Sequence, residues 1–336
     1  MITASPAARL SPTAPDWREL WRDAITDTGE LLDAVGLAHL GDHLPPGDAG
    51  FALRVPRGFV ARMQPGDPRD PLLLQVLPQL AELDQVPGFS ADAVGDLAAR
   101  EARGVLHKYH GRALLIASGS CAVNCRYCFR RHFPYGEEIA AAGQWRQALA
   151  HLQADPSISE LILSGGDPLA LATSKLEELG RGLAELPHVT RLRIHTRLPV
   201  VLPERVDAPF LAWLEALPLQ KVVVLHANHA NEFDAGVDAA CARLRQAGAI
   251  LLNQSVLLRG INDQVEALSA LSERLFAAGV LPYYLHQLDR VQGAAHFEVD
   301  DARALALVEE VRQRLPGYLV PRLVREVAGD ASKRPL

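Results

Sequence analysis

The sequence predicts an α/β fold in which a parallel sheet is covered by helices on both faces. Three observations lead to this prediction: short apolar runs alternate with helical segments, polar clusters follow the runs, and the composition allows a large core. The 336 residues are 49% apolar and 22% charged, which excludes disorder and collagen-like repetition. A chain of this length buries roughly 75% of its unfolded surface, so its core needs no disulfide framework.

The first 110 residues differ in pattern from the rest of the chain. Asp16 is placed as the N-cap of an amphipathic segment, with Glu19 three residues later, and proline-rich stretches follow. Residues 1–15 show neither a basic start nor an apolar run of signal-peptide length. We expect residues 1–110 to form a mainly helical and irregular cap region that carries no chemistry.

Six apolar runs follow and are predicted as buried strands. They span residues 113–117, 158–163, 190–194, 221–225, 249–256 and 281–286. Segments with helical spacing lie between them at 175–185, 237–247 and 265–278. This alternation fits a complete or incomplete α/β barrel, or a doubly wound sheet.

Polar clusters begin where the predicted strands end. They span residues 118–128, 164–167, 195–197, 226–232 and 287–289. In both candidate architectures the chemistry gathers at the carboxyl ends of the strands. We therefore expect one active site at that end of the sheet.

Charge and hydropathy exclude several classes of partner. The net charge is −6, so no overall basic field attracts nucleic acid or an anionic membrane. The longest apolar stretches are far shorter than the ~20 residues that span a bilayer. We expect a soluble, cytoplasmic protein.

Three of the four cysteines are crowded directly after the first predicted strand. Cys121, Cys125 and Cys128 lie within eight residues, and Cys241 stands alone. Thiolates suit zinc or iron–sulfur clusters. Three ligands on a four-iron cluster leave one iron open for a substrate or cofactor. A structural zinc site with Cys241 or a histidine as fourth ligand stays open, although Cys241 is better explained as a packing thiol.

The C-x3-C-x2-C loop resembles the radical S-adenosylmethionine (SAM) enzymes, whose fold is a partial (β/α)6 TIM-like barrel. The resemblance implies that the three cysteines bind a [4Fe–4S] cluster whose open iron chelates SAM. The glycine-rich motif after the second strand also resembles theirs and implies SAM binding by Ser164, Gly165, Gly166 and Asp167. Glycines let a backbone approach a ligand without an intervening Cβ.

A longer resemblance, from about Trp17 to the C-terminus, points to the lysine 2,3-aminomutase family. It rests on the stretches at residues 108–112, 121–131, 163–168, 193–203, 226–229, 253–262, 282–297 and 317–333. Enzymes of this family add pyridoxal phosphate (PLP) to the radical machinery and move the α-amino group of lysine to its β-carbon. The resemblance implies a radical SAM core at 111–300 and a C-terminal segment at 301–336.

Residue by residue, the resemblance implies how PLP is held. Lys333 matches the lysine that forms a Schiff base with PLP, which requires a nucleophilic amine. Tyr109 and Arg112 match residues around its ring and phosphate.

The same resemblance implies the substrate and SAM contacts. Arg130 matches the arginine that binds the substrate carboxylate, although the adjacent Arg131 could compete for this role. Asp289 and Glu326 match carboxylates that receive the ε-ammonium of lysine. His226 and Gln254 match positions near SAM.

Departures from the long family members favour a short bacterial branch. The sequence ends three residues after Lys333, the run before that lysine is Gly329-Asp330-Ala331-Ser332, and His286 replaces an expected tyrosine. This branch is linked to elongation factor P and supplies β-lysine, expected as the R enantiomer, for attachment by a separate lysyl ligase. An external one-electron reductant is also implied.

Three alternatives remain at this point. The chain could be another amino acid 2,3-aminomutase, although Asp289 and Glu326 disfavour an acidic substrate. It could be a radical SAM enzyme of a different reaction type, in which Lys333 is idle. It could also be a non-catalytic iron–sulfur or zinc-binding interaction protein.

Overall fold

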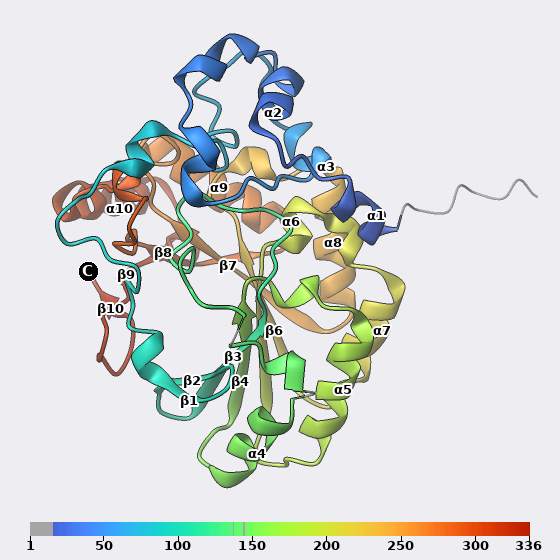
Figure 1. The fold of residues 1–336 in the computed structure, drawn as a ribbon. Coiled ribbons are helices and arrows are strands. Elements are labelled where there is room, and N and C mark those ends of the chain that lie inside the picture. Colours follow the sequence, from blue (N-terminus) through green and yellow to red (C-terminus); the bar gives the residue numbers. More distant parts are fainter. Residues whose placement is uncertain (1–15, 137, 144) are drawn as a thin grey trace, which may run out of the picture.

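The computed structural model describes residues 16–136, 138–143 and 145–336 and shows one sheet of ten strands (Figure 1). Our expectation that residues 1–15 carry no signal peptide lies outside the described residues. The strands are β1 (Arg100–Ala102), β2 (Val105–Tyr109), β3 (Arg112–Ser118), β4 (Glu160–Gly165), β5 (Arg191–Thr196), β6 (Gln220–His226), β7 (Ala249–Val256), β8 (Leu281–His286), β9 (Arg322–Arg325) and β10 (Arg334–Pro335).

Each strand pairs with the next one along the chain, and β3 to β9 are all parallel. This sequential order decides between the predicted architectures, because a doubly wound sheet reverses its strand order at a switch point. In the described part of the chain β1 and β10 do not pair with each other, so the barrel is open. The prediction of a partial α/β barrel is confirmed.

The six predicted strands are β3 to β8, whereas β1, β2, β9 and β10 were not predicted. These four unpredicted strands are short, and three of them, β1, β2 and β10, run antiparallel at the two edges of the sheet. By contrast, five of the six residues of β4 are buried, because the strand is covered on both faces. Burial on both faces explains why its sequence reads as an unbroken apolar run.

Helices surround the outer face of the barrel. The three predicted segments appear as α5 (Thr173–Ala184), α8 (Ala235–Gln246) and α9 (Val265–Ala277). Asp16 caps the first helix by accepting from the backbone N–H of Arg18 at 3.0 Å. The helices are α1 (Trp17–Arg22), α2 (Thr28–Ala34), α3 (Arg57–Val60), α4 (Arg146–Ala154), α5 (Thr173–Ala184), α6 (Leu198–Val201), α7 (Ala208–Ala216), α8 (Ala235–Gln246), α9 (Val265–Ala277) and α10 (Asp301–Arg314).

The N-terminal layer lies over the loops that follow the strands. The backbone N–H of Asn124 donates to the carbonyl of Arg54 at 3.0 Å, and the guanidinium of Arg62 donates to the carbonyl of Val200 at 2.8 Å. The sheet itself crosses the domain boundaries expected at residues 110 and 300, because β1, β2, β9 and β10 belong to it. A shared sheet does not decide where domains begin and end, so the expected division of the chain at these residues stays a prediction.

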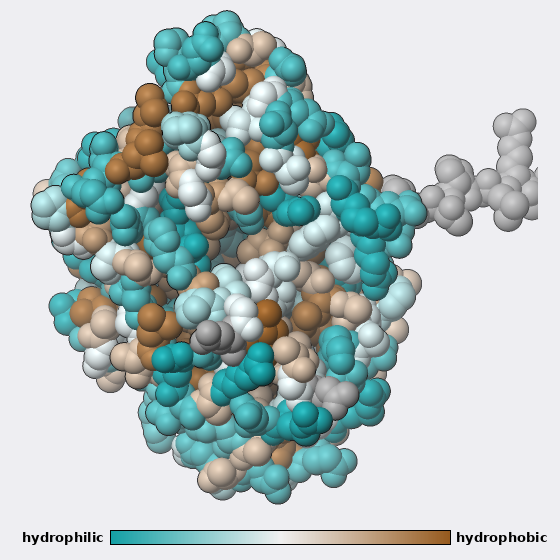
Figure 2. All heavy atoms as spheres, in the orientation of Figure 1, coloured by the Kyte–Doolittle hydropathy of each residue, from teal (hydrophilic) through white to brown (hydrophobic). Residues whose placement is uncertain are grey.

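The surface carries no continuous apolar belt on the face shown in Figure 2, where apolar side chains gather in small groups among hydrophilic ones. Among the described residues, no helix combines the length and the apolar character needed to cross a membrane.

Candidate active site

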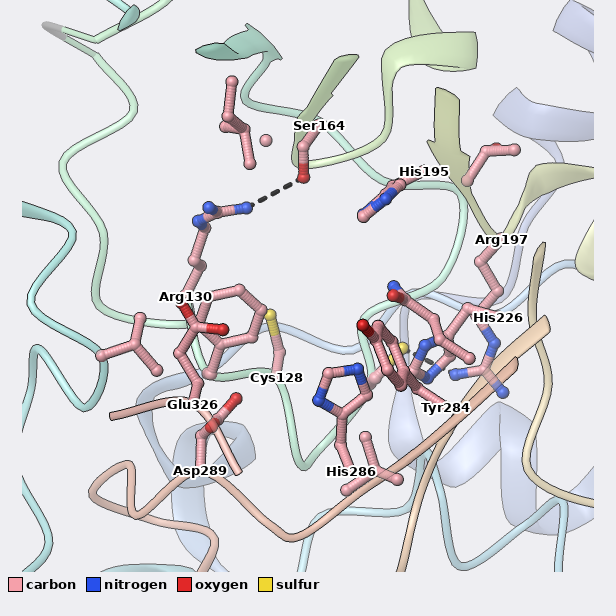
Figure 3. A pocket seen from close by; sticks show the side chains of 18 of the residues that line it. Cys128, Arg130, Ser164, His195, Arg197, His226, Tyr284, His286, Asp289 and Glu326 are labelled. Carbon is pink, nitrogen blue, oxygen red and sulfur yellow. Dashed lines mark hydrogen bonds between the residues drawn. The ribbon is translucent and has the colours of Figure 1, made fainter. Parts of the chain in front are cut away.

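A cavity of about 550 Å³ lies inside the barrel, toward the carboxyl ends of the strands. Figure 3 shows many of the side chains that point into it. Every residue predicted to bind a cofactor or substrate lines this cavity: Tyr109, Arg112, Cys121, Cys125, Cys128, Arg130, Ser164, Gly165, Gly166, Asp167, His226, Gln254, Asp289, Glu326 and Lys333. The fold thus brings together residues that are far apart in the sequence.

The three cysteines follow β3 as free thiols, and a buried ion-pair cluster holds their loop. Arg126 and Arg131, on either side of Cys128, both bind the carboxylate of Glu82, at 2.6 and 2.9 Å. Burial raises the pKa of Cys128 to about 11, so this thiol stays protonated near neutral pH unless a metal binds the sulfur and displaces the proton. Cys241 is buried in α8 and does not line the cavity, as expected for a packing thiol.

Among the described residues, no three His, Cys, Asp or Glu side chains are arranged to hold a single metal ion. A four-iron cluster places its cysteine ligands on different irons and so needs a wider spacing than one ion does. The thiol chemistry and the shared cavity wall therefore fit an iron–sulfur cluster.

The glycine-rich loop after β4 packs directly against the loop that leads to the cysteines. Gly165 adopts φ +115°, and a Cβ at Gly165 would lie 2.6 Å from the carbonyl oxygen of Ser118. A Cβ at Gly166 would lie 2.6 Å from that of Ser120. Loop packing thus requires both glycines, in addition to the close ligand approach that the sequence suggested.

Asp167 joins this loop to the one after β5. Its carboxylate accepts from the hydroxyl of Thr196 and the backbone N–H of Arg197, both at 2.7 Å, and from two further N–H groups. Burial raises the pKa of Asp167 to about 6, against the effect of these hydrogen bonds. Its oxygens are occupied within the protein, which fits a role in holding the glycine-rich loop in place.

His226 and Gln254 are paired neighbours at the ends of β6 and β7. A ring nitrogen of His226 lies 2.9 Å from the hydroxyl of Tyr127. Burial, assisted by the charge of Arg197, lowers the pKa of His226 to about 3, so its imidazole is neutral.

The two adjacent arginines have different surroundings. Arg130 lines the cavity, where its Nε binds Asp96 at 2.6 Å and its Nη1 donates to the hydroxyl of Ser164 at 3.0 Å (Figure 3). Arg131 does not line the cavity, and it binds Glu82 and the carbonyl of Gly293 instead. Of these two arginines, Arg130 is therefore the one that a ligand in the cavity can reach.

Two carboxylates, Asp289 and Glu326, lie on the same side of the cavity as Arg130 in Figure 3. Asp289 is half-buried, but its Oδ1 is enclosed and has no hydrogen-bond partner in the described part of the chain. Burial raises its pKa to about 7, which the nearby Glu326 supports and the charge of Lys333 opposes. A buried carboxylate oxygen without a partner indicates a site for a cation.

Lys333 lies in the connection between β9 and β10, and its side chain contacts one of these two carboxylates. Its Nζ lies 2.6 Å from Oε2 of Glu326, whose Oε1 accepts from the hydroxyl of Tyr109 at 2.6 Å. Burial acts to raise the pKa of Glu326, but the charge of Lys333 and these hydrogen bonds hold it below its usual value. The contact with Tyr109 bridges the gap between β2 and β9.

The chain has four lysines, of which only Lys108 and Lys333 line the cavity. Lys108 is tied to Asp96 at 2.7 Å and to the carbonyl of Val94 at 2.8 Å. Arg112 lies over the ring of Tyr109, and its buried Nε has no partner among the described residues. An amine and an unsatisfied guanidinium in one cavity fit the aldehyde and phosphate groups of PLP.

Several cavity residues were not predicted. Asp96 binds both Lys108 and Arg130, and these charges hold its pKa below the usual value although burial acts in the opposite direction. It comes from the N-terminal region in which we expected no chemistry, and its sequence surroundings carry no signal. Arg197 and His195 belong to the polar cluster at residues 195–197, which follows a predicted strand. The position of this cluster could therefore have indicated both residues.

An open barrel of parallel strands, with a three-cysteine loop after β3, its first parallel strand, and a glycine-rich loop after β4, its second, defines a radical SAM enzyme. Residues 110–188 match the family model described as "4Fe-4S single cluster domain".

Curated relatives match nearly the whole chain. The L-lysine 2,3-aminomutase of Escherichia coli is 48% identical over 97% of this chain and 96% of its own length. The enzyme of that name from Haemophilus influenzae is 45% identical over 97% and 98% of the two chains. The one from Clostridium subterminale is 31% identical over 96% of this chain and 77% of its own length.

The chain belongs to the lysine 2,3-aminomutase family, as its motifs had suggested. It is therefore an isomerase with a [4Fe–4S] cluster and SAM as cofactors, and the family implies PLP as well.

Proposed function

We propose that this enzyme interconverts L-α-lysine and β-lysine by moving the amino group between adjacent carbons. The observation that carries the proposal is one cavity that contains Lys333, three free cysteines, Arg130 and two carboxylates. The names of the relatives, from 31% to 48% identical, support lysine as the substrate.

The proposed cofactor ligands are Cys121, Cys125 and Cys128 for the cluster and Lys333 for PLP, with Arg112 and Tyr109 beside it. When bound, the cluster and SAM supply a 5′-deoxyadenosyl radical, and PLP delocalises the unpaired electron at the migrating nitrogen. The loops at residues 164–167 and the pair His226 and Gln254 form the proposed SAM-binding wall.

Arg130 binds the substrate carboxylate in this proposal. Asp96 and Ser164 occupy its Nε and Nη1, and its Nη2 makes no hydrogen bond among the described residues. These two contacts orient the guanidinium, so an incoming carboxylate meets a donor that is already held in place.

Asp289 and Glu326 bind the ε-ammonium of the substrate. A lysine side chain would satisfy the unpartnered Oδ1 of Asp289 and compensate its buried charge. A neutral or acidic side chain would leave that charge unpaired, so the site discriminates against glutamate.

The test is anaerobic incubation of the reconstituted enzyme with SAM, a one-electron reductant and L-lysine, followed by mass spectrometry of derivatised products. We expect β-lysine only when SAM, reductant and PLP are all present. If the enzyme turns over glutamate or alanine as fast as lysine or faster, lysine is not its preferred substrate. Consumption of SAM without any amino acid isomer would favour a different radical reaction.

The finer part of the proposal concerns the fate of the product. The residues around Lys333 resemble the branch linked to elongation factor P, so we infer that the product is (R)-β-lysine for attachment to that factor. Chiral chromatography identifies the enantiomer. A coupled reaction with elongation factor P and its lysyl ligase should raise the mass of the factor by one β-lysyl group, and the S enantiomer or an unmodified factor would contradict this assignment.

A further inference from the structure

Arg197 connects one of the three cysteines to a buried polar network that contains Tyr127, Gln75 and Glu232. Its Nη1 donates to Sγ of Cys125 at 2.7 Å and to the hydroxyl of Tyr127 at 2.5 Å. Its Nη2 donates to Oε1 of Gln75 at 2.7 Å and binds Oε2 of Glu232 at 3.0 Å. A formal positive charge is thus held against a single sulfur atom.

This network is closed to solvent. Gln75 and Glu232 are fully buried, and Arg197 is 6% exposed. In the described part of the chain, Glu232 is the only carboxylate that pairs with the guanidinium of Arg197. Because both charges are buried, solvent screens their effect on the sulfur very little.

The backbone of Arg197 is fixed independently of its side chain. Its N–H donates to Asp167 at 2.7 Å, in the loop that follows β4. The guanidinium can therefore be changed without removing the contact that joins the two loops.

We propose that Arg197 is a positioning and tuning residue that raises the reduction potential of the cluster through Cys125, and that Glu232 partly offsets this effect. The inference rests on the proposed cluster at Cys121, Cys125 and Cys128. Hydrogen bonds to cluster sulfurs and nearby charge are two of the factors that set iron–sulfur potentials. A donor cation at a cysteine sulfur stabilises the reduced cluster, which carries one more negative charge.

This role has a consequence for electron entry. The cluster accepts one electron from an external reductant before it reduces SAM. Arg197 makes electron transfer from the reductant to the cluster more favourable and electron transfer from the cluster to SAM less favourable. Glu232 has the opposite effect on both transfers. The buried pair therefore balances the two transfers.

The test is a potentiometric titration of the reconstituted cluster, without SAM or substrate, in which EPR spectroscopy measures the reduced form. Arg197→Met removes the charge and the hydrogen bond, and Arg197→Lys keeps the charge alone. Glu232→Gln removes the opposing charge. Tyr127→Phe is the matched control, because it removes a buried hydroxyl from the same network without changing its charge.

We expect the midpoint potential to become more negative in Arg197→Met, to change less in Arg197→Lys, and to become more positive in Glu232→Gln. Tyr127→Phe should shift it less than either charge change. A merely structural role would not produce shifts of opposite sign.

Equal potentials in all variants, or shifts of the same sign in Arg197→Met and Glu232→Gln, would overturn the inference. If Arg197→Met fails to assemble a cluster, the comparison of Glu232→Gln with Tyr127→Phe still decides it. A wild-type protein without a cluster would instead contradict the proposed function itself.

Discussion

Nζ of Lys333 lies 2.6 Å from Oε2 of Glu326, so the proposed PLP lysine is paired with one of the two proposed substrate carboxylates. The same carboxylate can receive the substrate ε-ammonium only after Lys333 has left it. Attachment of Lys333 to PLP would therefore prepare the substrate site as well as the cofactor site.

Replacing Lys333 tests this arrangement. Lys333→Ala is expected to abolish covalent PLP binding, because Lys108, the other lysine of the cavity, is held by both Asp96 and the carbonyl of Val94. Borohydride reduction followed by peptide mass spectrometry locates the modified residue. Lys221→Ala, near the start of β6 and outside the cavity, serves as the control. PLP attached to Lys108 in the Lys333→Ala variant would contradict the assignment.

The adjacent arginines should respond differently to the same substitution. Arg130→Lys loses a planar donor pair and is expected to raise the KM for lysine roughly 10- to 100-fold, which corresponds to about 1.5–3 kcal/mol. Arg131→Lys disturbs the buried contact with Glu82 and should lower thermal stability or iron content instead. Steady-state kinetics and thermal melts separate the two effects. A KM that rises only in Arg131→Lys would show that Arg131, not Arg130, binds the substrate carboxylate.

Iron content distinguishes the three clustered cysteines from the fourth. A triple variant with Cys121→Ala, Cys125→Ala and Cys128→Ala should contain no cluster by iron and sulfide analysis, and it should not cleave SAM. Cys241→Ala should keep its cluster and lose about 1 kcal/mol of stability, because it removes only a packed sulfur atom. Full iron content in the triple variant would disprove the proposed ligands.

Gly166 provides a test of loop packing. Gly166→Ala would place a Cβ 2.6 Å from a backbone oxygen beside the cysteine loop, a strain of about 1–3 kcal/mol. We expect roughly tenfold or greater weakening of SAM binding, measured by equilibrium dialysis. Gly58→Ala, whose added methyl group meets no atom within 4 Å, is the control. Equal affinities in both variants would show that the loop tolerates the methyl group.

Activity should depend on pH through Asp289. Burial raises its pKa to about 7, so the group is protonated below that pH and carries the charge that attracts an ammonium above it. We therefore expect kcat/KM for lysine to rise with pH until about 7 or slightly above, because PLP attachment removes the opposing charge of Lys333. Asp289→Asn should lower kcat/KM and flatten this limb of the profile. An unchanged profile would assign the ionisation to another group.

Much of the fold and the site could be predicted from local patterns. The run at 158–163 reads as a buried strand because β4 is covered on both faces, and the spacing of Cys121, Cys125 and Cys128 depends only on a short loop. The short edge strands β1 and β10 escaped prediction because too few of their residues are buried to leave a periodic pattern. Asp96 escaped it because its partners, Lys108 and Arg130, are distant in sequence.

The sequence by itself determined the parallel α/β architecture, the three-cysteine loop and the family, since these depend on hydrophobic period and on residues close together in the chain. Only the tertiary structure decided that the sheet is an open barrel, that Arg130 rather than Arg131 lines the cavity, and that Arg197 contacts Cys125. Each of these depends on which segments meet across the barrel. Such long-range contacts depend on how the whole chain packs, and no local pattern records them.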